Sequence, residues 1–144
     1  MQQRAQIIAC ARNYVGVRFR HQGRDRVTGL DCLGLLIVSA RDAGIRLHGK
    51  CPTMLDVVDY GHLPDMHRLR SMLEQYLQPV AYPQVGDVVL LTVEGRAQHL
   101  ALVSDYPQPQ ALGMIHAYAG ARRVVEHRLD DAWRQQIVQS YQLP

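Results

Sequence analysis

The chain has 144 residues, the usual size of one domain, and 47% of them are hydrophobic, as expected for a globular protein with one core. Sixteen Lys and Arg against 13 Asp and Glu give a formal charge of +3, and the basic residues are dispersed along the sequence. This charge is too small and too scattered to indicate nucleic-acid binding. Three cysteines cannot all pair within one chain, which excludes a complete disulfide framework and favours a reducing compartment.

The sequence also lacks the patterns of export, membrane spans and metal sites. The N-terminus has no apolar core of signal-peptide length, and no stretch approaches the about 20 apolar residues of a membrane span. We therefore expect no membrane span and no export by a signal of its own. Cys10, Cys32 and Cys51 form no C-x-x-C pair, so no zinc site is expected.

The first half of the chain has the spacing of helices. Apolar residues recur every three or four positions, and Gly and Pro mark the boundaries. We expect a surface helix at 2–15, a loop at 16–30, a buried helix at 31–44, irregular structure with room for one helical turn at 46–62, and a second surface helix from Pro64 to Pro79. Asp31 is the expected N-cap of the buried helix, and Gly44 its terminator.

From Gly86 onward the pattern changes to the alternation of strands. The expected strands are 88–93, 98–103, 114–119, 122–127 and 137–143, with a turn at 94–96 and a short helix at 130–135 that buries Trp133. Helices followed by a meander of strands predict an α+β fold, in which N-terminal helices pack on a C-terminal antiparallel sheet. No linker interrupts residues 1–144, so a single domain is expected.

Cys32 is the strongest candidate for a nucleophile. It follows the predicted N-cap Asp31 and so occupies the first turn of a helix, where free backbone N–H groups and the helix dipole favour the thiolate. Cys10 and Cys51 have no such position and are interpreted as structural cysteines. On this basis an alkylating reagent is expected to label Cys32 before the other two.

Two histidines on successive predicted strands complete the candidate site. Alternation places His99, Ala101 and Val103 on one face of the sheet. The same rule puts His116 on one face of the following strand. If these strands are neighbours, His116 can contact the ring of His99 and fix its tautomer, while His99 acts as the base for Cys32.

The other histidines have a plainer interpretation. We expect His21, His48, His62, His67 and His127 to be surface residues. Of these, His21 is the one closest to the candidate site, because it lies on the loop that precedes Cys32.

Taken together, these motifs resemble the NlpC-type cysteine peptidases, and within them the branch encoded in phage tail modules. The matching segments cover nearly the whole chain in the same order and spacing. They are GVRFRHQG at 16–23, DCLGL at 31–35, GDVVL at 86–90, QHLAL at 98–102, IHAYA at 115–119, VEH at 125–127 and WR at 133–134.

The resemblance implies a papain-like α+β fold and hydrolysis of amide bonds in peptidoglycan stem peptides, typically between D-glutamate and a diamino acid. It implies Cys32 as nucleophile, His99 as base and His116 as the residue that orients His99, without a metal or cofactor. Phe19, His21 and Asp31 then lie in the oxyanion and substrate region. It further implies phage tail-tip or hub proteins as partners, and a virion protein made in the host cytoplasm that acts at the bacterial cell wall or periplasm.

One departure from the family pattern concerns the oxyanion hole. Family members usually carry Tyr at the position of Phe19, and Phe has no hydroxyl with which to donate a hydrogen bond. A structural tail-tip component with the peptidase fold and little activity is therefore an alternative. An acyltransferase or amidase on the same fold is a further one, although the sequence offers no apolar tunnel or membrane anchor for lipid chemistry.

Overall fold

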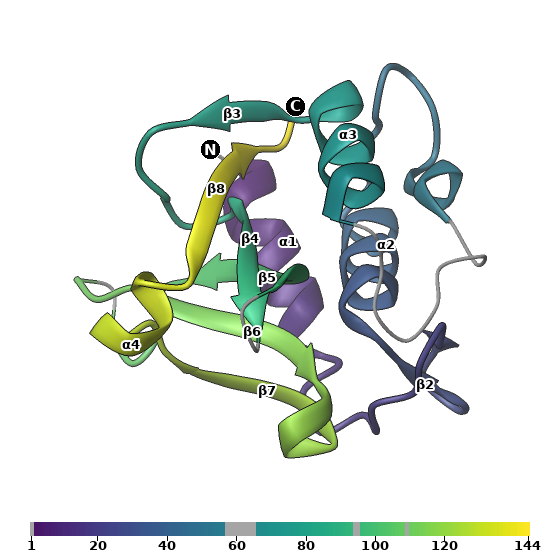
Figure 1. Cartoon of the computed structure of the whole chain (residues 1–144). Helices are drawn as coiled ribbons and strands as arrows, with labels where there is room; N and C mark the ends of the chain where they lie inside the picture. Colours follow the sequence, from purple (N-terminus) through teal and green to yellow (C-terminus); the bar gives the residue numbers. More distant parts are fainter. Residues whose placement is uncertain (1, 57–65, 94–95, 109) are drawn as a thin grey trace.

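The computed structural model describes residues 2–56, 66–93, 96–108 and 110–144. Helices come first and most strands follow, as the sequence predicted (Figure 1). In chain order the elements are α1 (Gln2–Arg12), β1 (Arg24–Asp25), β2 (Gly29–Leu30), α2 (Cys32–Asp42), η1 (Pro52–Leu55), α3 (Met66–Tyr76), β3 (Gln78–Val80), β4 (Val88–Val93), β5 (Arg96–Ser104), β6 (Gly113–Tyr118), η2 (Ala119–Ala121), β7 (Arg123–Arg128), α4 (Asp131–Arg134) and β8 (Ile137–Gln142).

The main sheet has six strands in the order β3-β8-β4-β5-β6-β7, and every pair is antiparallel. The predicted α+β class with an antiparallel sheet is therefore confirmed. Two pairings were not predicted: β1 with β2 inside the expected loop, and β3 at the edge of the sheet. Pro79 lies in β3, and an edge strand tolerates a residue that cannot donate a hydrogen bond.

Helices α1, α2 and α3 pack on one face of the sheet (Figure 1). Helix α2 is the central one, and its residues from Leu33 to Ala40 are all buried. They contact apolar side chains of the strands, among them Leu100 and Leu102 of β5 and Ile115 of β6. Burial of this continuous apolar run fixes α2, and with it Cys32, against the middle strands of the sheet.

A second, smaller apolar cluster covers the opposite face of the sheet. It contains Ala101 and Val103 of β5 and Met114 of β6, with Trp133 of α4 packed against it. Trp133 is only half-buried, so the prediction that α4 buries it is correct in part. The division of residues between the two clusters confirms the predicted alternation along β5 and β6.

Three predicted features lie partly outside the described residues. They are the irregular segment at 46–62, the start of the helix at Pro64 and the turn at 94–96. Among the described residues, no helix is both long enough and apolar enough to cross a membrane.

Candidate active site

Cys32 is the first residue of α2, immediately after its N-cap Asp31, as predicted. The Asp31 carboxylate accepts hydrogen bonds from the backbone N–H of Gly34 at 2.8 Å and of Gln22 at 2.9 Å. Arg24 donates to the same carboxylate at 2.8 Å and to Asp56 at 2.9 Å. Asp31 therefore caps the helix and ties the preceding loop to it, which fixes the position of the adjacent Cys32.

Gly34 lets the loop approach the start of α2 more closely than any other residue would. A Cβ atom at this position would lie 2.1 Å from the backbone oxygen of Gly23. Gly23 is confined in turn, because its own Cβ would lie 2.3 Å from the oxygen of Gly29. Two glycines thus allow two backbone segments to stack beside Cys32.

The Cys32 thiol lies in an apolar environment between α2 and the sheet. The small hollow beside it is lined by Leu35 and Leu36 of α2, by four residues of β4 and β5, and by Ile115, and it has no room for a water molecule. Burial first, and then the negative charge of Asp31, raise the pKa of the thiol to about 12. Hydrogen bonds from the backbone of Leu100 and Leu33 act in the opposite direction without reversing the shift.

The expectation that the helix terminus lowers the thiol pKa is therefore wrong. The helix terminus does supply N–H groups, but desolvation of the sulfur outweighs them. Cys51 shows the opposite shift: all three cysteines are partly exposed, but hydrogen bonds from Thr53 lower the pKa of Cys51. Burial raises the pKa of Cys10. The expected order of labelling changes accordingly, with Cys51 first.

His99 and His116 are in direct contact, as predicted. His99 Nε2 lies 2.6 Å from His116 Nδ1, and both side chains are buried. Burial lowers the pKa of His99 to about 4. Burial, together with the neighbouring His99 and His127, lowers the pKa of His116 to about 2. Both rings are therefore neutral at physiological pH, and each has one N–H donor and one lone-pair acceptor.

The Cys32 thiol contacts the backbone of Leu100, the residue that follows His99 in β5. Within the described part of the chain, no hydrogen bond joins the thiol to a ring nitrogen of His99. The Nε2 atom of His99 is hydrogen-bonded to His116, so Nδ1 is the nitrogen that remains to accept the thiol proton. Catalytic hydrogen bonds often tighten only when substrate binds.

His127 was expected at the surface, but it is half-buried and belongs to this cluster. Its Nε2 atom lies 2.8 Å from Nε2 of His116, and its Nδ1 atom lies 2.9 Å from the carbonyl oxygen of Arg128. The predicted hairpin contained the signal that reveals this contact. In its register His116 pairs with Val125, so His127 lies diagonally across from His116 on the same face.

Aromatic rings enclose the three histidines. Tyr118 stacks on His116 with ring centroids 5.2 Å apart, and Trp133 meets the same imidazole edge-on at 5.1 Å. Trp133 also lies 5.7 Å from the ring of His127. These contacts hold the imidazoles in place and keep water from the hydrogen bonds between them.

The remaining predicted site residues lie on the loop before α2 and at its N-cap. Phe19 is half-buried and packs against the same core as Cys32, and its backbone N–H donates to Arg122. His21 is half-buried rather than fully at the surface. Asp31 serves as the cap described above. His48 is exposed as predicted, whereas His62 and the side chain of His67 lie outside the described residues.

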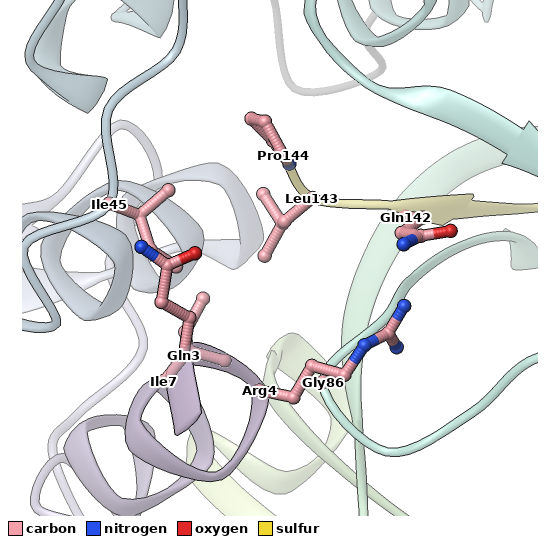
Figure 2. Close-up of a pocket in the computed structure, with 8 residues that line it drawn as sticks. All are labelled: Gln3, Arg4, Ile7, Ile45, Gly86, Gln142, Leu143 and Pro144. Carbon is pink, nitrogen blue, oxygen red and sulfur yellow. The ribbon is translucent and has the colours of Figure 1, made fainter. Parts of the chain in front are cut away.

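A second hollow lies elsewhere, between α1 and the C-terminal segment (Figure 2). It measures about 120 Å³. Its polar side chains are Gln3, Arg4 and Gln142, and Arg4 forms an ion pair with Asp87 at 2.8 Å. It contains no Cys or His side chain, so it is separate from the candidate site. Across the described residues, no group of His, Cys, Asp and Glu has the arrangement of a metal site.

Comparison with known families assigns the chain. The profile of the NlpC/P60 family matches residues 16–142, which include the loop before α2, the cysteine helix and the sheet. The chain belongs to the NlpC/P60 family. A search of curated proteins returned no match.

Solved structures of NlpC/P60 proteins share the fold. An NLP/P60 family protein similar to a lipoprotein, from Staphylococcus aureus, is 16% identical with a TM-score of 0.65, and the match covers 98% of this chain and 41% of that one. The P60 domain of an antigen from Mycobacterium avium subspecies paratuberculosis is 15% identical with a TM-score of 0.62, over 99% and 94% of the two chains. The NlpC/p60 domain of the peptidoglycan hydrolase SagA is 18% identical with a TM-score of 0.58, over 97% and 98%. The chain thus spans less than half of the S. aureus protein.

Proposed function

We propose that this chain is a cysteine peptidase that hydrolyses amide bonds in the stem peptides of peptidoglycan. The observation that carries the proposal is the buried hydrogen bond between His99 and His116 in a member of the NlpC/P60 family. Cys32 begins the cysteine helix and contacts the backbone of Leu100, the residue after His99. Two of the structural neighbours, SagA and RipB of Mycobacterium tuberculosis, are peptidoglycan hydrolases, which supports this substrate class.

In the proposed reaction, the Cys32 sulfur attacks the carbonyl carbon of the scissile amide. The thiol proton passes to Nδ1 of His99, and His116 holds Nε2 of that ring. Because burial raises the pKa of the thiol to about 12 and lowers that of His99 to about 4, the two groups start neutral. The proton therefore moves during attack rather than before substrate binds.

The tetrahedral intermediate then collapses. His99 returns the proton to the leaving amine, the C–N bond breaks, and a thioester remains on Cys32. Water then attacks the thioester while His99 takes one of its protons; the C–S bond breaks, the acid product leaves, and His99 returns the proton to the Cys32 sulfur. The backbone N–H of Cys32 at the start of α2 donates to the oxyanion. Phe19 contributes no donor to it, since its side chain has no hydroxyl.

We further propose the D-glutamyl–diamino acid bond as the bond that is cut, and a phage tail tip as the place from which the enzyme reaches the cell wall. Both extend the resemblance of the sequence motifs to the tail-associated branch of the family. Mass spectrometry of the virions made from the genome that encodes this chain tests the second point. Finding the chain among tail proteins supports it, and finding it only in cell lysate contradicts it.

The test of the activity is digestion of purified peptidoglycan, followed by separation and mass analysis of the released fragments. Wild type and Cys51→Ala should release the same peptides, and Cys32→Ala should release none. A new N-terminal diamino acid in the products identifies the proposed bond. Equal products from wild type and Cys32→Ala would remove the enzymatic interpretation.

The alternative function is a structural tail-tip component that keeps the peptidase fold with little turnover. Two observations favour it: the hollow at Cys32 has no room for water, and Phe19 stands where the family usually has Tyr. On this alternative, wild type releases no peptides in the assay above. Phe19→Tyr separates the two observations: turnover in this variant assigns the inactivity to the missing hydroxyl, and no turnover supports a purely structural role.

A further inference from the structure

The contact between His116 and His127 extends the candidate site beyond the three residues used so far. His127 links Nε2 of His116, at 2.8 Å, to the carbonyl oxygen of Arg128, at 2.9 Å from its own Nδ1 atom. Together with the 2.6 Å contact between His116 and His99, these form an unbroken chain of hydrogen bonds. This series of hydrogen bonds begins at the backbone carbonyl of Arg128 and ends at the ring of His99.

The carbonyl at one end determines which nitrogen donates and which accepts in each of these hydrogen bonds. A carbonyl oxygen only accepts, so Nδ1 of His127 must carry the hydrogen. In a neutral ring Nε2 of His127 is then an acceptor, and the facing Nε2 of His116 must donate to it. Nδ1 of His116 is in turn left as an acceptor, so Nε2 of His99 must donate. The lone pair of His99 is thereby placed on Nδ1, the nitrogen that the proposed mechanism needs.

We propose that His127 is a positioning residue. Its hydrogen bond to the Arg128 carbonyl fixes its own tautomer, which fixes that of His116, which in turn keeps His99 in the tautomer that accepts the Cys32 proton. This inference rests on the proposed function, because it concerns the base of that same reaction. It assigns a role to a histidine outside the triad, and the role is exerted through His116 rather than by contact with substrate.

The surroundings of the three histidines keep their tautomers and ring orientations fixed. Burial lowers the pKa of both His99 and His116, so each ring keeps one donor and one acceptor and cannot donate from both sides. Trp133 packs against the rings of His116 and His127, with centroids 5.1 and 5.7 Å away. A ring held this way cannot turn over to exchange its two nitrogens without displacing the indole.

The decisive experiment measures the tautomers directly. Protein labelled with ¹⁵N in its histidines is studied by NMR at pH 8, above the ordinary titration range of imidazole. The signals are assigned with single-histidine variants. In wild type we expect His99 and His116 as Nε2–H tautomers and His127 as the Nδ1–H tautomer. A wild-type His99 that carries its hydrogen on Nδ1 overturns the proposal.

Two variants of His127 separate the effect of its hydrogen bonds from the effect of its packing against Trp133. His127→Phe keeps a ring against Trp133 but removes both nitrogens, so His99 should become a mixture of tautomers. One hydrogen bond biases such an equilibrium by about two- to tenfold, so its loss leaves about half of the rings in the active tautomer, and kcat should fall by up to about twofold with KM unchanged. His127→Gln offers an amide oxygen to Nε2–H of His116 and should restore the wild-type tautomer and most of kcat.

The control is His48→Phe, a substitution at an exposed histidine that contacts Tyr76 and not the site. It should change neither the tautomers nor kcat. An unchanged His99 tautomer in His127→Phe contradicts the proposal. If wild type shows no turnover, the proposed function fails, while the NMR signals still show which tautomer each histidine adopts. If His127→Phe does not fold, the wild-type spectrum and His127→Gln carry the test.

Discussion

Gly34→Ala is the most informative perturbation of the cysteine helix. The added Cβ would lie 2.1 Å from the backbone oxygen of Gly23, whereas ordinary contacts of this kind begin near 3.4 Å. The loop cannot retreat freely, because Gly23 already lies against Gly29. Overpacking of this severity costs about 3 kcal/mol, and the better helix propensity of Ala recovers about 1 kcal/mol. The net loss of about 2 kcal/mol should lower Tm by about 6 °C.

The same variant should lose activity beyond its loss of stability. The start of α2 must move by about 1 Å to relieve the contact, and a displacement of this size at a nucleophile can cost about a hundredfold in rate. Thermal unfolding and peptidoglycan digestion at a temperature where the variant is folded measure the two effects separately. A variant with wild-type Tm and wild-type rate would refute the assigned role of the close backbone contact.

Ser39→Ala is the matched control in the same helix. Ser39 is fully buried, and within the described residues its hydroxyl has no hydrogen-bond partner. Removing an unsatisfied hydroxyl and gaining helix propensity should leave the stability unchanged or raise it by up to about 1 kcal/mol. Activity should stay at the wild-type level.

Three further predictions concern the reacting groups. Iodoacetamide near pH 7.5 should modify Cys51 first, with Cys10 and Cys32 following slowly, and Cys51→Ser should remove the fast phase. A fast phase at Cys32 would contradict the raised pKa of its thiol. His116→Ala should lower kcat by about a hundredfold with little change in KM in steady-state assays, because His99 loses its orienting partner. Because burial lowers the pKa of His99 to about 4 from its ordinary value near 6.5, the stability that its neutral form provides is complete above about pH 6.5 and is lost as the pH falls towards 4. This amounts to about 3 kcal/mol, and urea unfolding should show a smaller loss for His99→Gln.

Much of the fold was predictable because local signals agreed with the packing. Asp31 and Gly44 mark the two ends of α2, and the apolar run between them requires burial on all sides. Alternation along β5 and β6, together with the pairing of these strands, places His99 and His116 on one face. These predictions depend on near neighbours in sequence, where spacing determines geometry.

The remaining features depend on contacts between distant segments. The strand β3 was missed because Pro79 suggests a helix end, and only its pairing with β8 makes it a strand. His127 is expected at the surface from the sequence, whereas the register of the hairpin brings it to His116. The pKa of Cys32 was expected in the wrong direction, because the depth of the sulfur is a property of the packed core rather than of the helix end.

The most direct test of the central claim is a crystal structure of the chain after Cys32 has reacted with an electrophilic mimic of a stem peptide. We expect the mimic bonded to the sulfur and the Nδ1 atom of His99 within hydrogen-bonding distance of the reacting atoms, with Nε2 still on His116. A His99 ring turned away from the modified sulfur, or another side chain in its place, would contradict the assignment of His99 as the base.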